Sequence, residues 1–244
     1  AMNSHQLAFS GGAEKTSYYF SGGYLDQKGT LIGTGFKRYT LRANIDQQVK
    51  SWFKAGFSAN LTRSNQTVGL TDAFDAVTST VLYNTPVSPV KDAYGNFVQT
   101  TNIGVNSVAL TNNPVMLTSM RNVESVTTQA LGAIYADLKI YKGITFRTEG
   151  NYNFNLTSGK AYQPFLKNSE TGAVILSPSK LREQRNNSIY WAWKNYLNYD
   201  ATFGKHAVNA IAGYEAQEST YDYINANRNN LVLNLPSLNA GTKD

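Results

Sequence analysis

The sequence predicts an all-β fold, namely a segment of an antiparallel, up-and-down transmembrane β-barrel with about eight strands. Apolar and polar residues alternate over long stretches, most clearly in 37–46, 53–62 and 144–156. Short turns and long loops alternate between these stretches, and aromatic residues gather beside the short turns. Because successive side chains of a strand point to opposite faces, an alternation of period two indicates strands with one apolar and one polar face.

The candidate strands come in pairs along the chain, and several are much longer than the roughly 5–6 residues of most strands in soluble proteins. They are too long for a routine β-sandwich. The four pairs cover 5–11 and 16–26, 37–46 and 53–62, 126–140 and 144–156, and 188–203 and 206–217.

The connections carry the second signal. Within each pair the link is short and contains glycine or polar residues suited to a tight turn; these links are 11–15, 47–51, 141–143 and 204–205. Between pairs the connections are long: 27–35, about 64–125, about 157–187, and a last one that starts near Glu218. Short periplasmic turns and long extracellular loops are typical of outer-membrane barrels. We therefore expect residues 1–244 to be a single segment of a larger barrel domain.

Aromatic residues flank three of the short turns, and amphipathic rings favour the level of the lipid headgroups. The pairs are Trp52 and Phe53, Tyr141 and Phe146, and Tyr199 and Phe203. This favours an aromatic girdle, with the alternative that aromatic residues simply suit strands.

The longest loop is not uniform. Its stretch 71–84 has apolar residues at helical spacing and is stopped by Pro86, so we expect one short helix there. An ordered loop of this length is usually functional. Tyr83, Tyr94 and Phe97 are the candidate ligand-binding residues, because flat rings stack on sugar faces or pack against a partner. The alternative is that these rings anchor the loop to itself.

Composition excludes several classes of function. Charged residues make up 16% of the chain, against about 25% in an ordinary soluble domain. With no Cys and two His, we expect no metal site and no cofactor. The net charge of +6 is spread along the chain, which does not support nucleic-acid binding. Without an apolar stretch of about 18 residues, a helical membrane span is excluded.

No catalytic constellation stands out, so we expect no enzymatic activity. A β-rich hydrolase is the alternative, and it requires His206 or a nearby carboxylate such as Asp200 for activity.

The polar row of Arg38, Arg42, Lys54 and Arg147 is expected to face a barrel lumen, where it contacts a plug or favours anionic solutes. A solvated polar face is the default interpretation of such a row.

The first residues lack the charged and apolar regions of a signal peptide, which leaves a cytosolic protein or an excerpt of a longer chain.

An ordered series of motifs resembles the barrel of the SusC/RagA class of TonB-dependent outer-membrane transporters. The resemblance covers essentially the whole chain, and its specificity lies in the order and spacing of the series. The motifs are Leu7-Ala8-Phe9-Ser10-Gly11-Gly12, Lys15-Thr16-Ser17-Tyr18-Tyr19, Gly23-Tyr24-Leu25-Asp26-Gln27-Lys28-Gly29, Phe36-Lys37-Arg38-Tyr39-Thr40-Leu41-Arg42-Ala43-Asn44, Asn113-Pro114, Leu197-Asn198-Tyr199-Asp200, Phe203-Gly204-Lys205-His206, Ala212-Gly213-Tyr214-Glu215 and Leu235-Pro236-Ser237-Leu238-Asn239-Ala240-Gly241.

This resemblance implies a lipid-embedded barrel of about 22 strands closed by an N-terminal plug. It further implies a location in the cell outer membrane, energy supplied by TonB, and a SusD-like surface lipoprotein that captures oligosaccharides or peptides. The plug and the TonB-contacting segment are not in this sequence. One alternative is a soluble extracellular β-sheet protein that binds glycans or host surfaces, with Phe53, Phe57 and Leu61 in a protein core. A passive porin is another.

Overall fold

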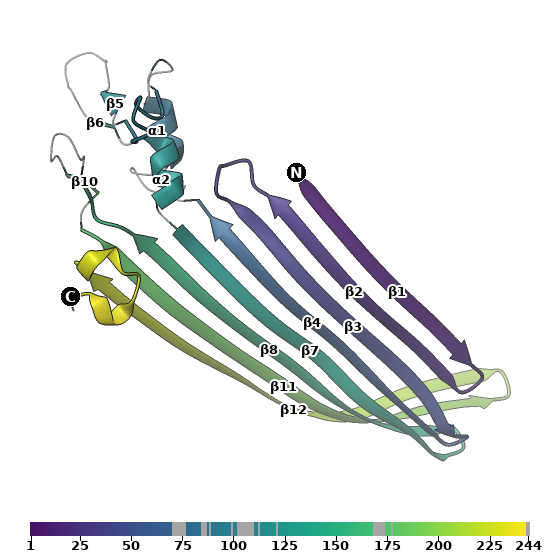
Figure 1. Cartoon of the computed structure of the whole chain (residues 1–244). Coiled ribbons are helices and arrows are strands. Elements are labelled where there is room, and N and C mark those ends of the chain that lie inside the picture. Colours follow the sequence, from purple (N-terminus) through teal and green to yellow (C-terminus); the bar gives the residue numbers. More distant parts are fainter. Residues whose placement is uncertain are drawn as a thin grey trace.

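The structure is a computed structural model that describes residues 1–69, 77–83, 87, 89–98, 100–101, 110–111, 113–120, 122–167, 174–176 and 178–242. Its main element is one antiparallel sheet of eight strands, each paired with the next strand of the sheet along the chain (Figure 1). These strands are β1 (Met2–Ala13), β2 (Thr16–Lys28), β3 (Gly35–Lys50), β4 (Phe53–Val68), β7 (Asn122–Tyr141), β8 (Ile144–Gln163), β11 (Lys180–Phe203) and β12 (His206–Asn229).

Smaller elements sit in the connections. They are helices α1 (Val77–Tyr83) and α2 (Pro114–Met120), the strand pairs β5 (Thr100–Thr101) with β6 (Leu110–Thr111) and β9 (Leu166–Lys167) with β10 (Val174–Leu176), and the 3-10 turns η1 (Val232–Asn234) and η2 (Leu238–Ala240). The predicted all-β, up-and-down fold is confirmed. In this segment β1 and β12 form the two edges of the sheet. Among the described residues, neither helix has the length and hydropathy needed to cross a membrane.

The strands are longer than the alternation predicts, so the loops are shorter. β4 continues through Val68 and β7 begins at Asn122, so the connection covers 69–121 rather than about 64–125. The connection expected at about 157–187 covers 164–179, and β12 runs on past Glu218 to Asn229. In the extra residues of β4 both faces are polar, as in Arg63-Ser64-Asn65, so pairing continues where the apolar–polar contrast has ended.

The expected short helix is present as α1, which covers the C-terminal part of the predicted stretch; residues 71–76 and 84 lie outside the described residues. The second helix of this loop, α2, was not predicted. It is a single short helix, and seven residues are too few for a clear apolar period.

The short turns lie together at one end of the sheet and the long connections at the other (Figure 1). Gly143 and Gly204 take positive φ angles of 79° and 59° in two of these turns, a conformation that glycine adopts without the strain of a Cβ. Trp52 and Tyr141 are exposed beside the turns, as expected of residues at the level of lipid headgroups.

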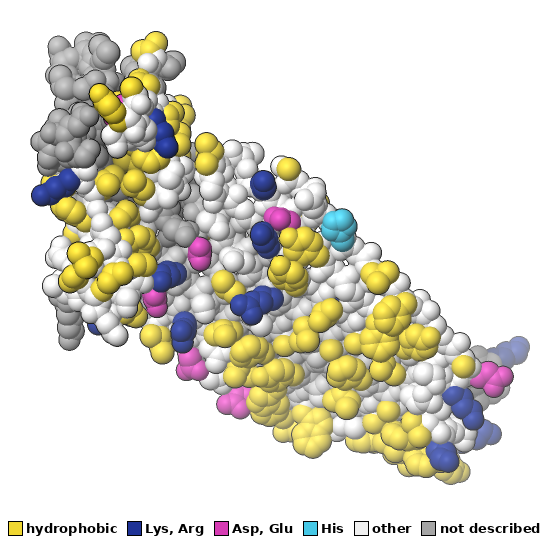
Figure 2. Space-filling model, viewed as in Figure 1, with side chains coloured by type: hydrophobic (Ala, Val, Ile, Leu, Met, Phe, Trp, Pro, Cys, Tyr) yellow, Lys and Arg dark blue, Asp and Glu magenta, His cyan; other side chains and the backbone are white. Residues whose placement is uncertain are grey.

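The strand register gathers the apolar residues on one face. Ile45 lies opposite Phe57, and Phe57 lies opposite Ile134. Hydrophobic side chains form a broad band across this face, with charged side chains along its margin nearer the long loops (Figure 2). We call the following set the apolar band: Leu7, Phe9, Phe20, Leu41, Ile45, Phe57, Leu61, Ile134, Phe146, Tyr152, Phe154, Ile189, Trp191, Trp193 and Leu197.

No protein layer covers the apolar band within the described part of the chain. Phe57 and Leu61 have 45% and 49% of their surface exposed, whereas a soluble protein would bury them in its core. The described hydrophobic core is a small cluster of Val77, Met116 and Leu117 in the loop between β4 and β7. A continuous exposed apolar surface of this kind fits contact with lipid.

Candidate functional site

The face opposite the apolar band is polar, and it carries all four residues of the row predicted to face the lumen. Arg38 and Arg42 point to this face from β3. Leu41 pairs with Leu61 in the apolar band, so the next residue, Arg42, which pairs with Asn60, points to the opposite face. Arg38 lies four residues before Arg42 and therefore shares its face. Lys54 of β4 and Arg147 of β8 lie on the same face, since both flank Asp137 of β7 in the register. The alternation therefore predicted correctly which side chains share a face.

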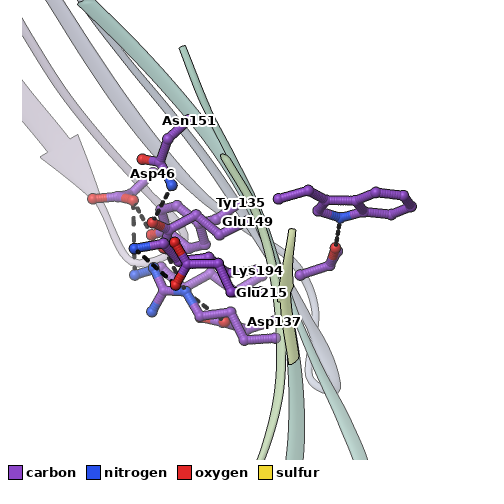
Figure 3. A network of polar contacts seen from close by, with 11 residues as sticks. Asp46, Tyr135, Asp137, Glu149, Asn151, Lys194 and Glu215 are labelled. Carbon is purple, nitrogen blue, oxygen red and sulfur yellow. Dashed lines mark hydrogen bonds and ion pairs between the residues drawn. The ribbon is translucent and has the colours of Figure 1, made fainter. Parts of the chain in front are cut away.

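Eight of these polar-face residues cross six strands near the short turns, as one connected group on β3, β4, β7 and β8 and a separate ion pair between β11 and β12 (Figure 3). We call this set the ionic belt, and its members are Asp46, Lys54, Tyr135, Asp137, Arg147, Glu149, Lys194 and Glu215. They occupy two neighbouring rows of the register. One row contains Glu149, Lys194 and Glu215 in succession, so acid and base alternate along it.

Arg147 is the centre of the ionic belt. Its Nε lies 3.4 Å from Asp137 Oδ1 and 3.4 Å from Glu149 Oε2. Its guanidinium carbon lies 4.0 Å from the centroid of the Tyr135 ring, a cation–π distance. The Tyr135 hydroxyl donates a hydrogen bond to Asp46. One cation therefore balances two carboxylates and also holds the ring that reaches across to the next acid.

The outer members form two further ion pairs. Lys54 Nζ lies 3.8 Å from Asp46 Oδ1, and Lys194 Nζ lies 3.8 Å from Glu215 Oε2. The side chain of Asn151 donates a hydrogen bond of 2.9 Å to Glu149 Oε1. Each carboxylate of the belt thus faces a positive charge, which stabilises charge that water reaches only in part.

Next to the ionic belt, toward the long loops, the polar face is hollowed. The hollow is lined by Arg42, Asn60, Asn151, Asn153 and Tyr190, among others. Within the described residues, Arg42 has no ion-pair partner, so its charge is available to whatever occupies the hollow. Its amides, its hydroxyls and the unpaired Arg42 lie among small and apolar residues such as Ala133 and Leu131, a lining that suits polar or anionic contents rather than covalent chemistry.

The residues required by a hydrolase do not come together. His206 begins β12 beside the tight turn and pairs with Phe203. The Asp200 carboxylate accepts a hydrogen bond from the Asn209 amide, not from His206. Among the described residues, no group of three or more His, Asp or Glu side chains is arranged to hold a metal ion.

At the opposite end of the sheet, Asn113 holds the loop between β4 and β7 together. It is 2% exposed and immediately precedes α2. Its Oδ1 accepts from the backbone N–H groups of Val115 and Met116 at 3.0 and 3.2 Å, so it caps the helix. Its Nδ2 donates to the carbonyls of Val90 and Val98 at 2.8 and 3.0 Å, which fixes the base of a hairpin.

Asp92 shapes the tip of this hairpin. Its Oδ1 accepts from the backbone N–H groups of Asn96 and Tyr94 at 2.8 and 2.9 Å, and Gly95 turns the chain at a φ of 86°. The hydrogen bond from Asn96 is the main cause that lowers the pKa of Asp92 below its ordinary value. Because the folded pKa is lowered, the stabilisation is present above the unfolded pKa and is lost as pH falls through the folded one.

The three predicted ligand-binding residues lie in this loop but in different surroundings. Tyr94 is at the tip of the hairpin with 85% of its surface exposed. Phe97 packs against the cluster of Met116 and Leu117, and the Lys91 ammonium lies 5.2 Å from its ring centroid. Tyr83 is the last residue of α1, and its side chain is outside the described part. Ligand binding by the three stays a prediction.

Sequence reasoning missed the role of Asn113. The signal was present as Asn113-Pro114, because Asn is a preferred helix cap and Pro is favoured at the first helical position. Sequence reasoning also missed the ion pairs of Arg147 with Asp137 and Glu149. Its partners come from separate strands, so they become visible only when the register is known.

We expect replacement of Asn113 by alanine to loosen this loop, because it removes a helix cap and the amide donor to the carbonyls of Val90 and Val98, of which Val90 keeps only its bond from the Val98 N–H. The expected local cost is about 1–2 kcal/mol. The measurement is the rate of trypsin cleavage after Lys91 in the full-length protein. Asn113→Ser is the control, since a serine oxygen keeps the cap acceptor without placing a buried charge against the two carbonyls. Equal cleavage rates for Asn113→Ala and the unchanged protein would contradict the assigned role.

Comparisons with known proteins agree with this geometry. No protein-family model matches the chain. It is 27% identical to TonB-dependent receptor P39 of Formosa agariphila over 92% of its own length and 20% of that protein. It is 25% identical to TonB-dependent receptor P3 of the same organism, over 89% of the chain and 22% of that protein. The chain therefore spans about a fifth of the length of these relatives.

Solved structures show the same fold. The chain matches the structure of the RagAB peptide transporter with a TM-score of 0.78 and 22% identity, over 100% of this chain and 27% of that one. The RagAB peptide importer in its open-open state gives a TM-score of 0.79 at the same identity and coverage. The eight-stranded sheet thus has the fold of about a quarter of each of these longer chains.

Together these findings confirm the resemblance to SusC/RagA-class TonB-dependent transporters. The chain is a segment of an outer-membrane β-barrel. The relatives are named as receptors and transporters, which agrees with the expectation that the chain is not an enzyme.

Proposed function

We propose that the chain forms part of the barrel wall of a TonB-dependent outer-membrane importer that takes up oligosaccharides or peptides together with a SusD-like surface lipoprotein. One observation carries the proposal: an exposed apolar band crosses seven of the eight strands, from β1 to β11, while the opposite face is polar. This division suits a wall between lipid and an aqueous lumen.

The polar face is proposed to line the lumen. The ionic belt lies near the short turns, which are periplasmic in outer-membrane barrels. Four acids and three bases there offer hydrogen bonds and ion pairs to a plug seated in the barrel, and their opposite charges leave a formal excess of one negative charge. Arg42, which is free in the neighbouring hollow, favours anionic groups of a passing solute.

The names of the relatives support the import part of the proposal. Two relatives are named TonB-dependent receptors, and two similar structures are those of a peptide transporter or importer. Uptake assays with the full-length protein in cells test it, with labelled oligopeptides and labelled oligosaccharides as separate probes. We expect import of one class to stop when TonB is removed. Import that continues without TonB would contradict energy coupling and favour a passive porin.

Tyr94 is proposed as the residue that meets the ligand or the lipoprotein, because its ring is free at the end of an ordered hairpin. Phe97 is proposed to hold that hairpin in place. We expect Tyr94→Ala to weaken ligand affinity about fivefold, from the loss of roughly 1 kcal/mol of ring stacking. The measurement is the concentration dependence of uptake. Tyr141→Ala removes another highly exposed tyrosine, at the short-turn end; it is the control and should have no effect.

The lipoprotein is tested separately. A photoreactive side chain at position 94 of the full-length protein should crosslink to a SusD-like lipoprotein on intact cells. The same side chain at position 141, near the periplasm, should not. Crosslinking at neither or at both positions would contradict the proposed partner surface.

A further inference from the structure

Three cations lie on the apolar side of the sheet, just beyond the apolar band toward the long loops. Lys28 of β2, Lys37 of β3 and Arg63 of β4 are all exposed, and we call them the basic patch. Arg63 lies opposite Tyr39, and Lys37 lies opposite Asn65, so Lys37 and Arg63 are diagonal neighbours. Such neighbours are about 7–8 Å apart, within reach of one shared ligand.

The basic patch is not neutralised by the protein. Within the part of the chain that the structure describes, the side chains of Lys28, Lys37 and Arg63 have no hydrogen-bond or ion-pair partner. The nearest acid by register is Asp26, opposite Lys37, and its carboxylate accepts the Tyr24 hydroxyl at 3.3 Å. Three cations thus stand against one carboxylate.

Farther along the same margin the charges are balanced. Lys160 of β8 lies 3.5 Å from Glu183 of β11, and acids and bases alternate in this part of the margin. Charged side chains of both signs are visible along the edge of the apolar band in Figure 2. The positive excess is therefore local to β2–β4 and is not a general property of the margin.

A shallow groove leads from the apolar band to the basic patch. Its floor is Gly22, which has no side chain between Leu7 and Leu41. Tyr24 and Tyr39 line its end nearer the patch, with ring centroids 5.2 Å apart. A Cβ at Gly22 would come within 3.7 Å of Leu41 Cδ2, so a larger side chain there would fill the groove.

We propose that this surface binds a phosphate-bearing glycolipid of the outer leaflet, with its phosphate between Lys37 and Arg63 and an acyl chain in the groove over Gly22. Cations at the membrane surface attract anionic headgroups, and they bind phosphate oxygens through charge-assisted hydrogen bonds. The continuity of the groove with the lipid-facing band selects a lipid rather than a free phosphate. The inference rests on the proposed barrel with its long loops outside, but not on import.

The test uses the full-length transporter, purified in detergent and titrated with lipid A by native mass spectrometry. We expect Lys37→Gln with Arg63→Gln to bind lipid A roughly 30-fold more weakly, since each surface cation contributes about 1 kcal/mol. Lys15→Gln with Lys205→Gln is the matched control, because it removes two exposed charges from the short turns at the other end of the sheet. This control should bind lipid A like the unchanged protein.

Two further measurements separate phosphate from acyl chain. Dephosphorylated lipid A should bind the unchanged protein as weakly as lipid A binds the double variant. Gly22→Leu should weaken both lipids. Equal binding of lipid A to the double variant and the unchanged protein, or equal binding of the two lipids, would overturn the proposal. If the double variant does not fold, the salt dependence of lipid A binding to the unchanged protein decides, and affinity unaffected by salt would overturn it.

The outcome is distinguishable from failure of the proposed import function. Lipid binding is measured on the purified protein without TonB or solute, whereas import is measured in cells. Loss of lipid A binding in the double variant supports the basic patch whether or not import depends on TonB.

Discussion

Replacement of Phe57 by arginine is expected to destabilise the full-length barrel by about 2–4 kcal/mol, the cost of an arginine near the middle of the bilayer. Phe57 lies within the apolar band, between Ile45 and Ile134 in the register. Within the described part of the chain, no other layer of the protein covers its side chain. The arginine would have to hold its charge among lipid chains. The measurement is the urea midpoint for unfolding in lipid vesicles, followed by the heat-dependent gel mobility of the barrel.

Asn60→Arg is the matched control for this prediction. Asn60 is three residues farther along β4 and points to the polar face beside Arg42. An arginine there remains in an aqueous lumen, so only a small loss from charge repulsion is expected. If the two variants were equally stable, the assignment of lipid-facing and lumen-facing sides would be wrong.

The fold was largely predictable because a strand with lipid on one face and water on the other alternates apolar and polar residues. The alternation in 53–62 correctly located β4 and the face of each of its side chains. This alternation depends on contact with lipid, so it ends where the apolar band ends. The extension of β4 to Val68 is held by backbone pairing between polar residues, which leaves no periodic signal in the sequence.

The candidate site was less predictable, because its interactions join residues far apart in the chain. Arg147 was expected on the polar face, but its contact with Asp137 depends on the exact register of β7 and β8. The surroundings of Phe97 likewise depend on α2, a helix too short to give a clear apolar period in the sequence. Sequence reasoning therefore placed residues on the right face or loop without pairing them.

Arg147→Met should produce the second large effect, because it removes the one cation that faces both Asp137 and Glu149. Breaking a fully buried ion pair by removing one partner costs about 3–5 kcal/mol. The Arg147 side chain retains 29% of its exposure, so water screens part of the remaining repulsion. We therefore expect a loss of about 2–3 kcal/mol in the free energy of unfolding of the full-length barrel. Its contacts are ion pairs rather than aligned hydrogen bonds, since Nε has no hydrogen-bond partner.

A triple variant separates charge from packing at this position. Arg147→Met combined with Asp137→Asn and Glu149→Gln removes the cation and both charges that it balances, while similar volumes are kept. If charge balance is what Arg147 provides, the triple variant should recover most of the lost stability in the same urea titration. A triple variant as unstable as Arg147→Met would show instead that the guanidinium acts mainly by packing on the Tyr135 ring. Arg147→Lys should lie in between, because a lysine keeps the charge but lacks the planar group that stacks on an aromatic face.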